Sequence, residues 1–326
     1  RLEQAAQATK TAFVFPGQGS QKVGMLAELA EQFSVVRDTF AEASAALGFD
    51  LWQIAQSGEG LDQTENTQPV LLTASIALWR VWLELGGIAP KYLAGHSLGE
   101  YSALVAAEAM TLADAVKLVH LRGKLMQSAV PQGTGAMAAI LGLADEKVIE
   151  LCQKVNASAA GQGSVEAANY NAQGQVVIAG STALVQQVMA EAKEQSGKAI
   201  ALPVSVPSHC TLMKPAAEKF AEALEQTAIE LPHLPVIQNV NAEIATDVAQ
   251  LRQALTAQLY QSVQWTRTMQ YLQDEGVQYV VECGPGTVLS NLAKRLPNIE
   301  KAFAIDSKAR MEDALNAVLV AEGKIA

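Results

Sequence analysis

One arrangement of residues occurs three times in this chain: a short apolar run ends in a glycine-rich turn and continues as a helix. The stretch "TAFVFPGQGSQ" predicts a strand at 11–15 followed by a helix at about 22–33. A second unit has a strand ending at Gly95 and a helix at about 98–109, and a third has a strand at 278–282 before its turn and helix. Strands of this kind, separated by helices, form a parallel sheet with helices on both faces, so we expect an α/β protein.

The middle of the chain follows another order. A strand at 134–143 and an amphipathic helix precede the runs "SVEAANYN" and "QVVIAG", a second helix and the run "KAIALPVS". This β-α-β-β-α-β order is that of a ferredoxin-like unit. Because 326 residues exceed what one hydrophobic core usually serves, we expect a ferredoxin-like small domain at 131–205. It is inserted into a discontinuous large α/β domain made of 1–130 and 206–326.

Composition and charge exclude several classes of protein. Half of the residues are apolar and 17% are charged, and 23 basic against 33 acidic residues give a net charge of -10 without the basic stripe of a nucleic-acid-binding protein. The most apolar helix candidate, 70–85, is interrupted by Arg80 and Glu84, and the first ten residues lack the apolar core of a signal peptide. We therefore expect a folded cytoplasmic protein with no nucleic-acid or membrane partner.

Cysteines and glycine turns give no sign of a metal or a nucleotide. Cys152, Cys210 and Cys283 are odd in number and lack CxxC spacing, which predicts reduced thiols. In "GQGSQKVG", Lys22 stands where the dinucleotide fingerprint needs its third glycine, and Met25 stands where a phosphate loop needs lysine. We expect neither a metal ion nor a cofactor.

The segment "GHSLG" at 95–99 has the pattern G-x-S-x-G between a predicted strand and a predicted helix. Its glycines permit the tight turn that exposes Ser97 at the helix N-terminus, as in a nucleophile elbow. The alternative is that Ser97 only caps the helix, as serine often does. The strand before the turn and the helix after it favour the nucleophile.

A serine hydroxyl needs a base, usually histidine, and the chain has four. His96 is adjacent to the serine, and neighbours at a sharp turn generally point apart. His120 lies in a predicted helix, and His233 lies between prolines in "LPHLP". His209, in "LPVSVPSHCTL", follows an apolar strand and a proline at a turn from which its side chain can face a cleft. It is our preferred base.

The order of these residues argues against an ordinary α/β-hydrolase. In that fold an acid and then a histidine follow the serine, the histidine usually near the C-terminus. No histidine follows His233 here, and no HGGG-type oxyanion segment occurs. A serine–histidine pair oriented by something other than a carboxylate that the sequence reveals fits better.

Arg122 lies on the apolar face of a predicted helix at about 112–127, three or four residues from Leu118, Val119 and Leu125. An unpaired buried guanidinium is costly. It is either paired with an Asp or Glu or extended to solvent, or it is a fixed receptor for a substrate carboxylate. The last interpretation predicts an acyl group with a free acid.

Several ordered motifs resemble those of the stand-alone bacterial malonyl-CoA:acyl carrier protein transacylases of type II fatty-acid synthesis. They are "FVFPGQGSQ", "GHSLGEYSALVAAEAM", "RGKLMQ", "GTGAMAAILGL", "NYNAQGQVVIAG", "PVSVPSHCTLMKPA", "QLYQSVQWTR" and "ECGPGTVLSNLAKR". The resemblance runs from about residue 11 to 310. It implies a hydrolase-like large domain with a parallel central sheet, a ferredoxin-like insertion, and a cleft between them.

The resemblance also implies roles for individual residues. Ser97 would become malonylated and His209 would activate it, while the backbone N–H groups of Gln18 and Leu98 would form the oxyanion hole. The backbone carbonyl of Gln258 would orient the base.

For the acyl group, the resemblance implies that Arg122 binds the malonyl carboxylate. Asn171 and Met126 would line the acyl pocket, with His96 close by.

The activity implied is ping-pong transfer of malonyl from malonyl-CoA to the phosphopantetheine thiol of acyl carrier protein, for fatty-acid elongation, by a cytoplasmic monomer without a cofactor. The family's carrier protein is acidic, as this chain is, so a basic patch is needed for docking. Its candidates, which are otherwise ordinary solvated charges, are Lys294, Arg295, Lys214 and Lys219. Two other functions stay open: a hydrolase or thioesterase, and an idle binding module of a larger synthase, against which the intact Ser97, His209 and Arg122 argue.

Overall fold

The computed structural model describes residues 2–326 and contains a parallel sheet with the strand order β7-β2-β1-β8-β9. The central strand β1 is buried along its whole length, because helices cover both faces of the sheet. Alternate residues of β1 face opposite sides, so Phe13 and Phe15 pack into one core cluster while Ala12 and Val14 pack into another. The strands are β1 (Thr11–Phe15), β2 (Tyr92–Gly95), β7 (Val236–Ile237), β8 (Tyr279–Glu282) and β9 (Lys301–Ala304).

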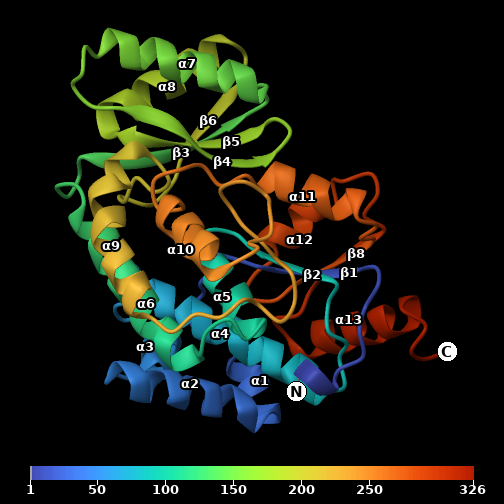
Figure 1. The fold of residues 1–326 in the computed structure, drawn as a ribbon. Helices are drawn as coiled ribbons and strands as arrows, with labels where there is room; N and C mark the ends of the chain where they lie inside the picture. The colour runs from blue at the N-terminus through green and yellow to red at the C-terminus, as the bar shows by residue number, and fades with distance from the viewer. Residues whose placement is uncertain (1) are drawn as a thin grey trace.

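Helices of the large unit pack on this sheet (Figure 1). On one face the Phe13 ring meets the rings of Trp79 and Trp82 edge-on, at centroid distances of 5.3 and 5.0 Å. The helices are α1 (Ala27–Gln32), α2 (Ser34–Leu47), α3 (Leu51–Ser57), α4 (Thr64–Glu84), α5 (Gly99–Ala106), α6 (Leu112–Ser128), α9 (Lys214–Gln226), α10 (Val248–Ala257), α11 (Trp265–Asp274), α12 (Val288–Ala293) and α13 (Lys308–Ala321), with short 3-10 helices at Leu2–Gln4 and Thr211–Met213.

The second sheet is antiparallel and has the order β4-β5-β3-β6. Helices α7 and α8 cover its outer face, at the top of Figure 1. This topology is ferredoxin-like, so the predicted fold class, a parallel α/β unit carrying a ferredoxin-like insertion, is confirmed. The elements are β3 (Gly135–Leu141), α7 (Asp145–Ser158), β4 (Val165–Ala172), β5 (Gln175–Ser181), α8 (Thr182–Glu194) and β6 (Lys198–Ala201). The domain boundaries at 131 and 205 stay a prediction.

Three details differ from the sequence-based expectation. The helix expected at 22–33 begins only at Ala27, since Gly24 and Leu26 have left-handed φ values of 84° and 64°. The last strand of the small sheet ends at Ala201 and not at 205, because Pro203 has no N–H to continue the ladder. Strands β7 and β9 were not expected; β7 is only two residues long, too short for a periodic pattern.

The two sheets are tied together at strand β4. Val263, just before α11, accepts a hydrogen bond from Tyr170 N–H at 3.0 Å and donates to Ala168 O at 2.8 Å. From the end of α12, Arg295 donates to Gln175 Oε1 at 2.8 Å. These backbone and side-chain bonds fix the small sheet over the carboxyl edge of the parallel sheet, where ligand sites of α/β proteins lie.

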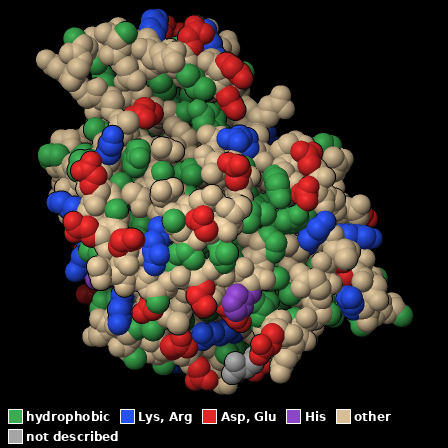
Figure 2. Space-filling model, viewed as in Figure 1, with side chains coloured by type: hydrophobic (Ala, Val, Ile, Leu, Met, Phe, Trp, Pro, Cys, Tyr) green, Lys and Arg blue, Asp and Glu red, His purple; other side chains and the backbone are tan. Residues whose placement is uncertain are grey.

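The surface in view mixes Lys and Arg with Asp and Glu and shows no continuous basic stripe (Figure 2). Within residues 2–326, no helix has both the length and the apolar character needed to cross a membrane.

Candidate active site

Ser97 lies in the turn between β2 and α5 and has a left-handed φ of 56°. The turn is tight because two glycines let the backbone close on itself. A Cβ on Gly95 would lie 1.8 Å from Gly99 O, and one on Gly99 would lie 2.0 Å from Phe15 O. This is the geometry of a nucleophile elbow at the end of a strand.

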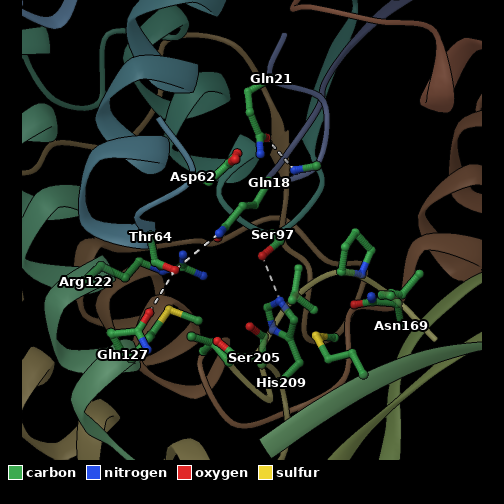
Figure 3. Close-up of a pocket in the computed structure, with 18 of the residues that line it drawn as sticks. Gln18, Gln21, Asp62, Thr64, Ser97, Arg122, Gln127, Asn169, Ser205 and His209 are labelled. Atoms are coloured by element: carbon green, nitrogen blue, oxygen red, sulfur yellow. Dashed lines mark hydrogen bonds between the residues drawn. The ribbon is translucent and has the colours of Figure 1, made fainter. Parts of the chain in front are cut away.

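The Ser97 hydroxyl does not cap the helix. The N-cap of α5 is Leu98, which has no side-chain cap bond, and Ser97 Oγ lies 2.7 Å from His209 Nε2 (Figure 3). The simple capping alternative is therefore not what the structure shows.

His209 is 2% exposed and hydrogen-bonded on both ring nitrogens. Its Nδ1 lies 2.6 Å from Gln258 O, and since a carbonyl only accepts, Nδ1 carries the proton. Nε2 is then free to accept the Ser97 hydroxyl proton. Burial, with a further contribution from Arg122, lowers the pKa of His209 to about 3, so the ring is neutral at physiological pH.

The other three histidines lie away from the hydroxyl. His96 Nε2 is 2.7 Å from Asn171 Oδ1, and its ring packs beside Trp265. His120 Nδ1 bonds Glu65 O at 2.8 Å, and His233 Nδ1 lies 2.9 Å from Glu108 Oε2 at the surface. Among the four, His209 alone contacts Ser97 Oγ.

The two backbone amides expected to form the oxyanion hole come from different segments. Leu98 is the next residue of the elbow, and Gln18 lies in the turn after β1. The elbow is joined to the end of β1 by a bond from His96 N–H to Phe15 O of 2.9 Å. Neither the Leu98 nor the Gln18 amide has an acceptor within residues 2–326. The Gln18 side chain is anchored by Thr64 at 3.4 Å (Figure 3).

Arg122 projects from α6 into the same cavity and is 1% exposed. It donates to Gln68 Oε1 and Gln258 Oε1, both at 2.9 Å, and its guanidinium carbon lies 5.5 Å from the Tyr101 ring centroid. All three partners are neutral. No carboxylate forms an ion pair with it in the part of the chain that the structure describes, although Glu100 acts on it at longer range, and Nε has no hydrogen-bond partner there.

Burial lowers the pKa of Arg122, but a guanidinium still remains protonated near neutrality. Hydrogen bonds to a charged group contribute about 1.5–3 kcal/mol each. They stabilise the cation without neutralising it, so the arrangement suits an anionic ligand group.

These residues share a cavity of about 420 Å³ between the two sheets. Met126 and His96 line it, whereas Asn171 does not; Asn169 of the same strand lines it instead, and Asn171 contacts His96. Asn169 is 8% exposed with an unpartnered Oδ1. The reason is local: irregularities interrupt the pairing of β4 with β5 between Ala167 and Asn169 and between Tyr170 and Ala172, so the alternation of side chains is broken between Asn169 and Asn171.

Sequence analysis missed a buried polar layer under the elbow. Asn239 follows β7, Glu100 lies in the first turn of α5 and Gln68 lies in α4; each is at most 1% exposed. Glu100 Oε1 accepts from Gln258 Nε2 at 3.0 Å and from Asn239 N–H at 3.2 Å. Burial raises the pKa of Glu100 to about 7. The one available signal was Glu100, a charge directly after the G-x-S-x-G turn.

A half-buried serine on a strand-to-helix elbow, hydrogen-bonded to a buried histidine, defines a serine-dependent acyl-transfer enzyme on an α/β fold. The chain belongs to the acyl transferase domain family, whose model matches residues 12–311.

Similarity to named relatives points to one kind of acyl transferase within this family. The chain is 52% identical over 310 residues to the malonyl CoA-acyl carrier protein transacylase of Salmonella typhimurium, which covers 94% of this chain and 99% of that protein. It is similar to the crystal structure of FabD from Acinetobacter baumannii, with a TM-score of 0.95 and 89% identity over 96% of this chain and 99% of that one. A malonyl-transacylase in complex with its type II PKS acyl-carrier protein gives a TM-score of 0.91 and 49% identity over 94% and 99%.

Proposed function

We propose that this protein transfers a malonyl group from malonyl-CoA to the phosphopantetheine thiol of acyl carrier protein, supplying malonyl-carrier protein for fatty-acid elongation. The observation that carries the proposal is the shared cavity. It contains a serine hydroxyl 2.7 Å from a neutral histidine and a buried guanidinium without a carboxylate partner among residues 2–326. The first supports acyl transfer, and the second supports an acyl group with a free carboxylate.

In the first half-reaction, Ser97 Oγ attacks the thioester carbonyl while its proton passes to His209 Nε2. The carbonyl oxygen becomes an oxyanion held by the Gln18 and Leu98 amides, and preorganised donors of this kind contribute roughly 3–4 kcal/mol each. The C–S bond then breaks. His209 returns its proton to the leaving sulfur, so coenzyme A departs as the thiol and a malonyl ester remains on Ser97.

The second half-reaction runs the same steps with another thiol. The phosphopantetheine S–H gives its proton to His209 as sulfur attacks the ester carbonyl; the ester C–O bond then breaks, and the proton returns to Ser97 Oγ as malonyl-carrier protein forms. Gln258 O accepts from Nδ1–H at 2.6 Å and stabilises the imidazolium formed in both steps. A carbonyl thus takes the place of a triad carboxylate.

Around the acyl chain, Arg122 binds the malonyl carboxylate and Met126 packs against its methylene. His96 and Asn171, bonded to each other at 2.7 Å, support the wall of the pocket beside the serine. Asn169, which lines the cavity, supplies a further polar side chain on that wall.

The test is the acyl-enzyme itself. Mixing the protein with malonyl-CoA is expected to give a persistent adduct of malonyl mass on Ser97, seen by intact and peptide mass spectrometry. Added holo carrier protein is expected to discharge it to malonyl-carrier protein.

Two other results would contradict the proposal, and each would identify a different function. Rapid release of free malonate without an accumulating adduct identifies a hydrolase or thioesterase. Tight binding of malonyl-CoA with neither adduct nor malonate identifies a binding module.

Carrier docking gives a separate prediction. Lys294 and Arg295 are exposed at the end of α12. Reversing both charges (Lys294→Glu with Arg295→Glu) is expected to lower discharge to the acidic carrier about tenfold while malonylation by malonyl-CoA stays near the parent rate, because surface charges act mainly on encounter. Stopped-flow or quenched-flow measurement of each half-reaction checks this.

The matched control places one reversal elsewhere, at the exposed Lys117 of α6. Because Arg295 also binds Gln175 of the small sheet, Lys294→Glu is measured alone as well. Equal loss in both half-reactions for every variant removes the docking role.

The lowered pKa of His209 predicts an unusual pH profile. A base must be unprotonated, and a folded-state pKa of about 3 keeps His209 neutral at every higher pH. The rate constant for Ser97 malonylation is therefore expected to stay flat from pH 8 to pH 5, where an ordinary histidine of pKa 6.5 would lose most of its activity.

Glu100, with a pKa near 7, titrates inside this window, so the profile is measured in parallel on Glu100→Gln. A change in the rate constant with pH that is seen in the parent and absent from Glu100→Gln is caused by the titration of Glu100. A fall centred near pH 6.5 that persists in Glu100→Gln contradicts the lowered His209 pKa.

We further propose a cytoplasmic monomer that needs no cofactor. The three cysteines are free and buried, which favours a reducing compartment. Sedimentation of the purified protein measures its oligomeric state.

A further inference from the structure

The Ser97 elbow is held from beneath by a side chain that the reaction steps above do not use. Asn239 follows β7 and is 1% exposed. Its Oδ1 accepts from Ser97 N–H at 2.8 Å, and its Nδ2 donates to Gly95 O at 2.5 Å. One side-chain amide therefore joins both ends of the turn.

The chemistry of the two contacts fixes the orientation of this amide. Gly95 O only accepts and Ser97 N–H only donates, so Nδ2 must face the first and Oδ1 the second. Gln258 Nε2 also donates to Oδ1, at 3.2 Å. A side chain without both a donor and an acceptor cannot make this pair of bonds.

The Asn239 backbone is fixed as well. Its N–H donates to Glu100 Oε1 at 3.2 Å, and its carbonyl accepts from Gln264 N–H at 2.8 Å. The Asn239 backbone is thus bonded to the start of α5 on one side and to the start of α11 on the other.

This contact matters because Ser97 has a φ of 56°, a conformation that a residue with a side chain adopts only where its surroundings impose it. The Ser97 N–H donates to Asn239 Oδ1, whereas the next backbone N–H along the chain, that of Leu98, has no acceptor within residues 2–326. It is the amide available to a developing oxyanion.

We propose that Asn239 is a positioning residue: by clamping Gly95 O and Ser97 N–H, it sets the backbone that directs Ser97 Oγ to His209 and Leu98 N–H to the acyl oxygen. This inference rests on the proposed malonyl transfer. It assigns Asn239 no contact with substrate, so its loss should slow the chemical step and spare substrate binding.

The experiment measures how fast and how completely Ser97 is malonylated, using malonyl-CoA, rapid quench and intact mass spectrometry on the full chain. In Asn239→Ala the rate constant is expected to fall roughly 10- to 100-fold, the range for a small misplacement of reacting groups. The final fraction of labelled protein is expected to match the parent. Asn239→Asp, which keeps the size and the acceptor but donates nothing to Gly95 O when ionised, is expected to be slowed at least as much.

Binding is measured separately by calorimetry with malonyl-CoA, on Ser97→Ala and on Ser97→Ala with Asn239→Ala. The two dissociation constants are expected to agree within about threefold, which places the effect in the chemical step. The matched control is Asn241→Ala: Asn241 lies two residues on, its Oδ1 accepts from Gln238 and from Glu243 N–H, and it has no bond to the elbow.

The outcomes are distinguishable. A parent rate constant with a reduced labelled fraction in Asn239→Ala means that the side chain only supports folding, and it overturns the inference. Parent rate and fraction in Asn239→Ala, or equal slowing in Asn241→Ala, overturn it too. If the parent itself gains no malonyl adduct, the proposed function fails first and the clamp fails with it.

Discussion

Ser97→Ala is expected to abolish the malonyl adduct and to slow malonyl transfer by about 10⁴-fold or more, as loss of an enzyme's nucleophile does. The physical reason is that the hydroxyl bonded to His209 Nε2, at 2.7 Å, is that of Ser97, which the left-handed backbone of the elbow holds in place. Mass spectrometry for the adduct and a carrier-protein transfer assay measure the two effects.

The matched control for this variant is Ser102→Ala, five positions on in α5. Ser102 is buried, and its hydroxyl has no partner among residues 2–326. It is expected to keep the parent rate. An adduct that survives in Ser97→Ala, mapped to another residue, would contradict the assignment of the nucleophile.

Arg122→Ala is expected to lower kcat/KM for malonyl-CoA by about 10³-fold and to leave the acetyl-CoA value nearly unchanged or improved. A carboxylate about 4 Å from a guanidinium gains about 4 kcal/mol at an effective dielectric constant of 20, and about 1.4 kcal/mol corresponds to a factor of ten. Acetyl lacks the carboxylate and loses nothing. Competition kinetics with the two thioesters give the ratio directly.

Arg122→Lys separates charge from geometry. Lysine keeps the charge but cannot hold Gln68 Oε1 and Gln258 Oε1 while also presenting a planar pair of donors to a carboxylate. An intermediate malonyl preference is expected. If the malonyl-to-acetyl ratio does not change in Arg122→Ala, Arg122 is structural, and thermal unfolding of the variant then measures its contribution.

The fold was largely predictable because its elements carry local patterns. The parallel strands at Thr11–Phe15 and Tyr92–Gly95 are short, apolar and followed by glycine turns, and the inserted unit has a complete β-α-β-β-α-β order. Strand β7 escaped prediction because two residues carry no period. The start of α1 was misplaced because the left-handed Leu26 leaves no mark in the sequence.

The candidate site was predictable where a residue type implies chemistry. The glycines around Ser97 predicted a nucleophile elbow, and elimination among four histidines predicted His209 as the base. The place of Arg122 on an apolar helix face predicted a buried cation. Asn239 and Gln68 escaped because a single amide in a loop or helix looks like any other. The Gln258 side chain escaped for the same reason, although it joins Arg122 to Ser97 O.

The sequence by itself determined the serine on its elbow, the arginine on an apolar helix face and the two-sheet architecture, because helix and strand periods and turn chemistry act over a few neighbouring residues. Only the tertiary structure decided how far apart the reacting groups are and what surrounds them. Ser97 Oγ reaches His209 Nε2 across 112 positions of chain, and Asn239 reaches Ser97 N–H across 142. Such contacts depend on how the parallel sheet, the inserted unit and the segment after β7 pack together, and burial in that packing, not residue type, lowers the pKa of His209 and raises that of Glu100.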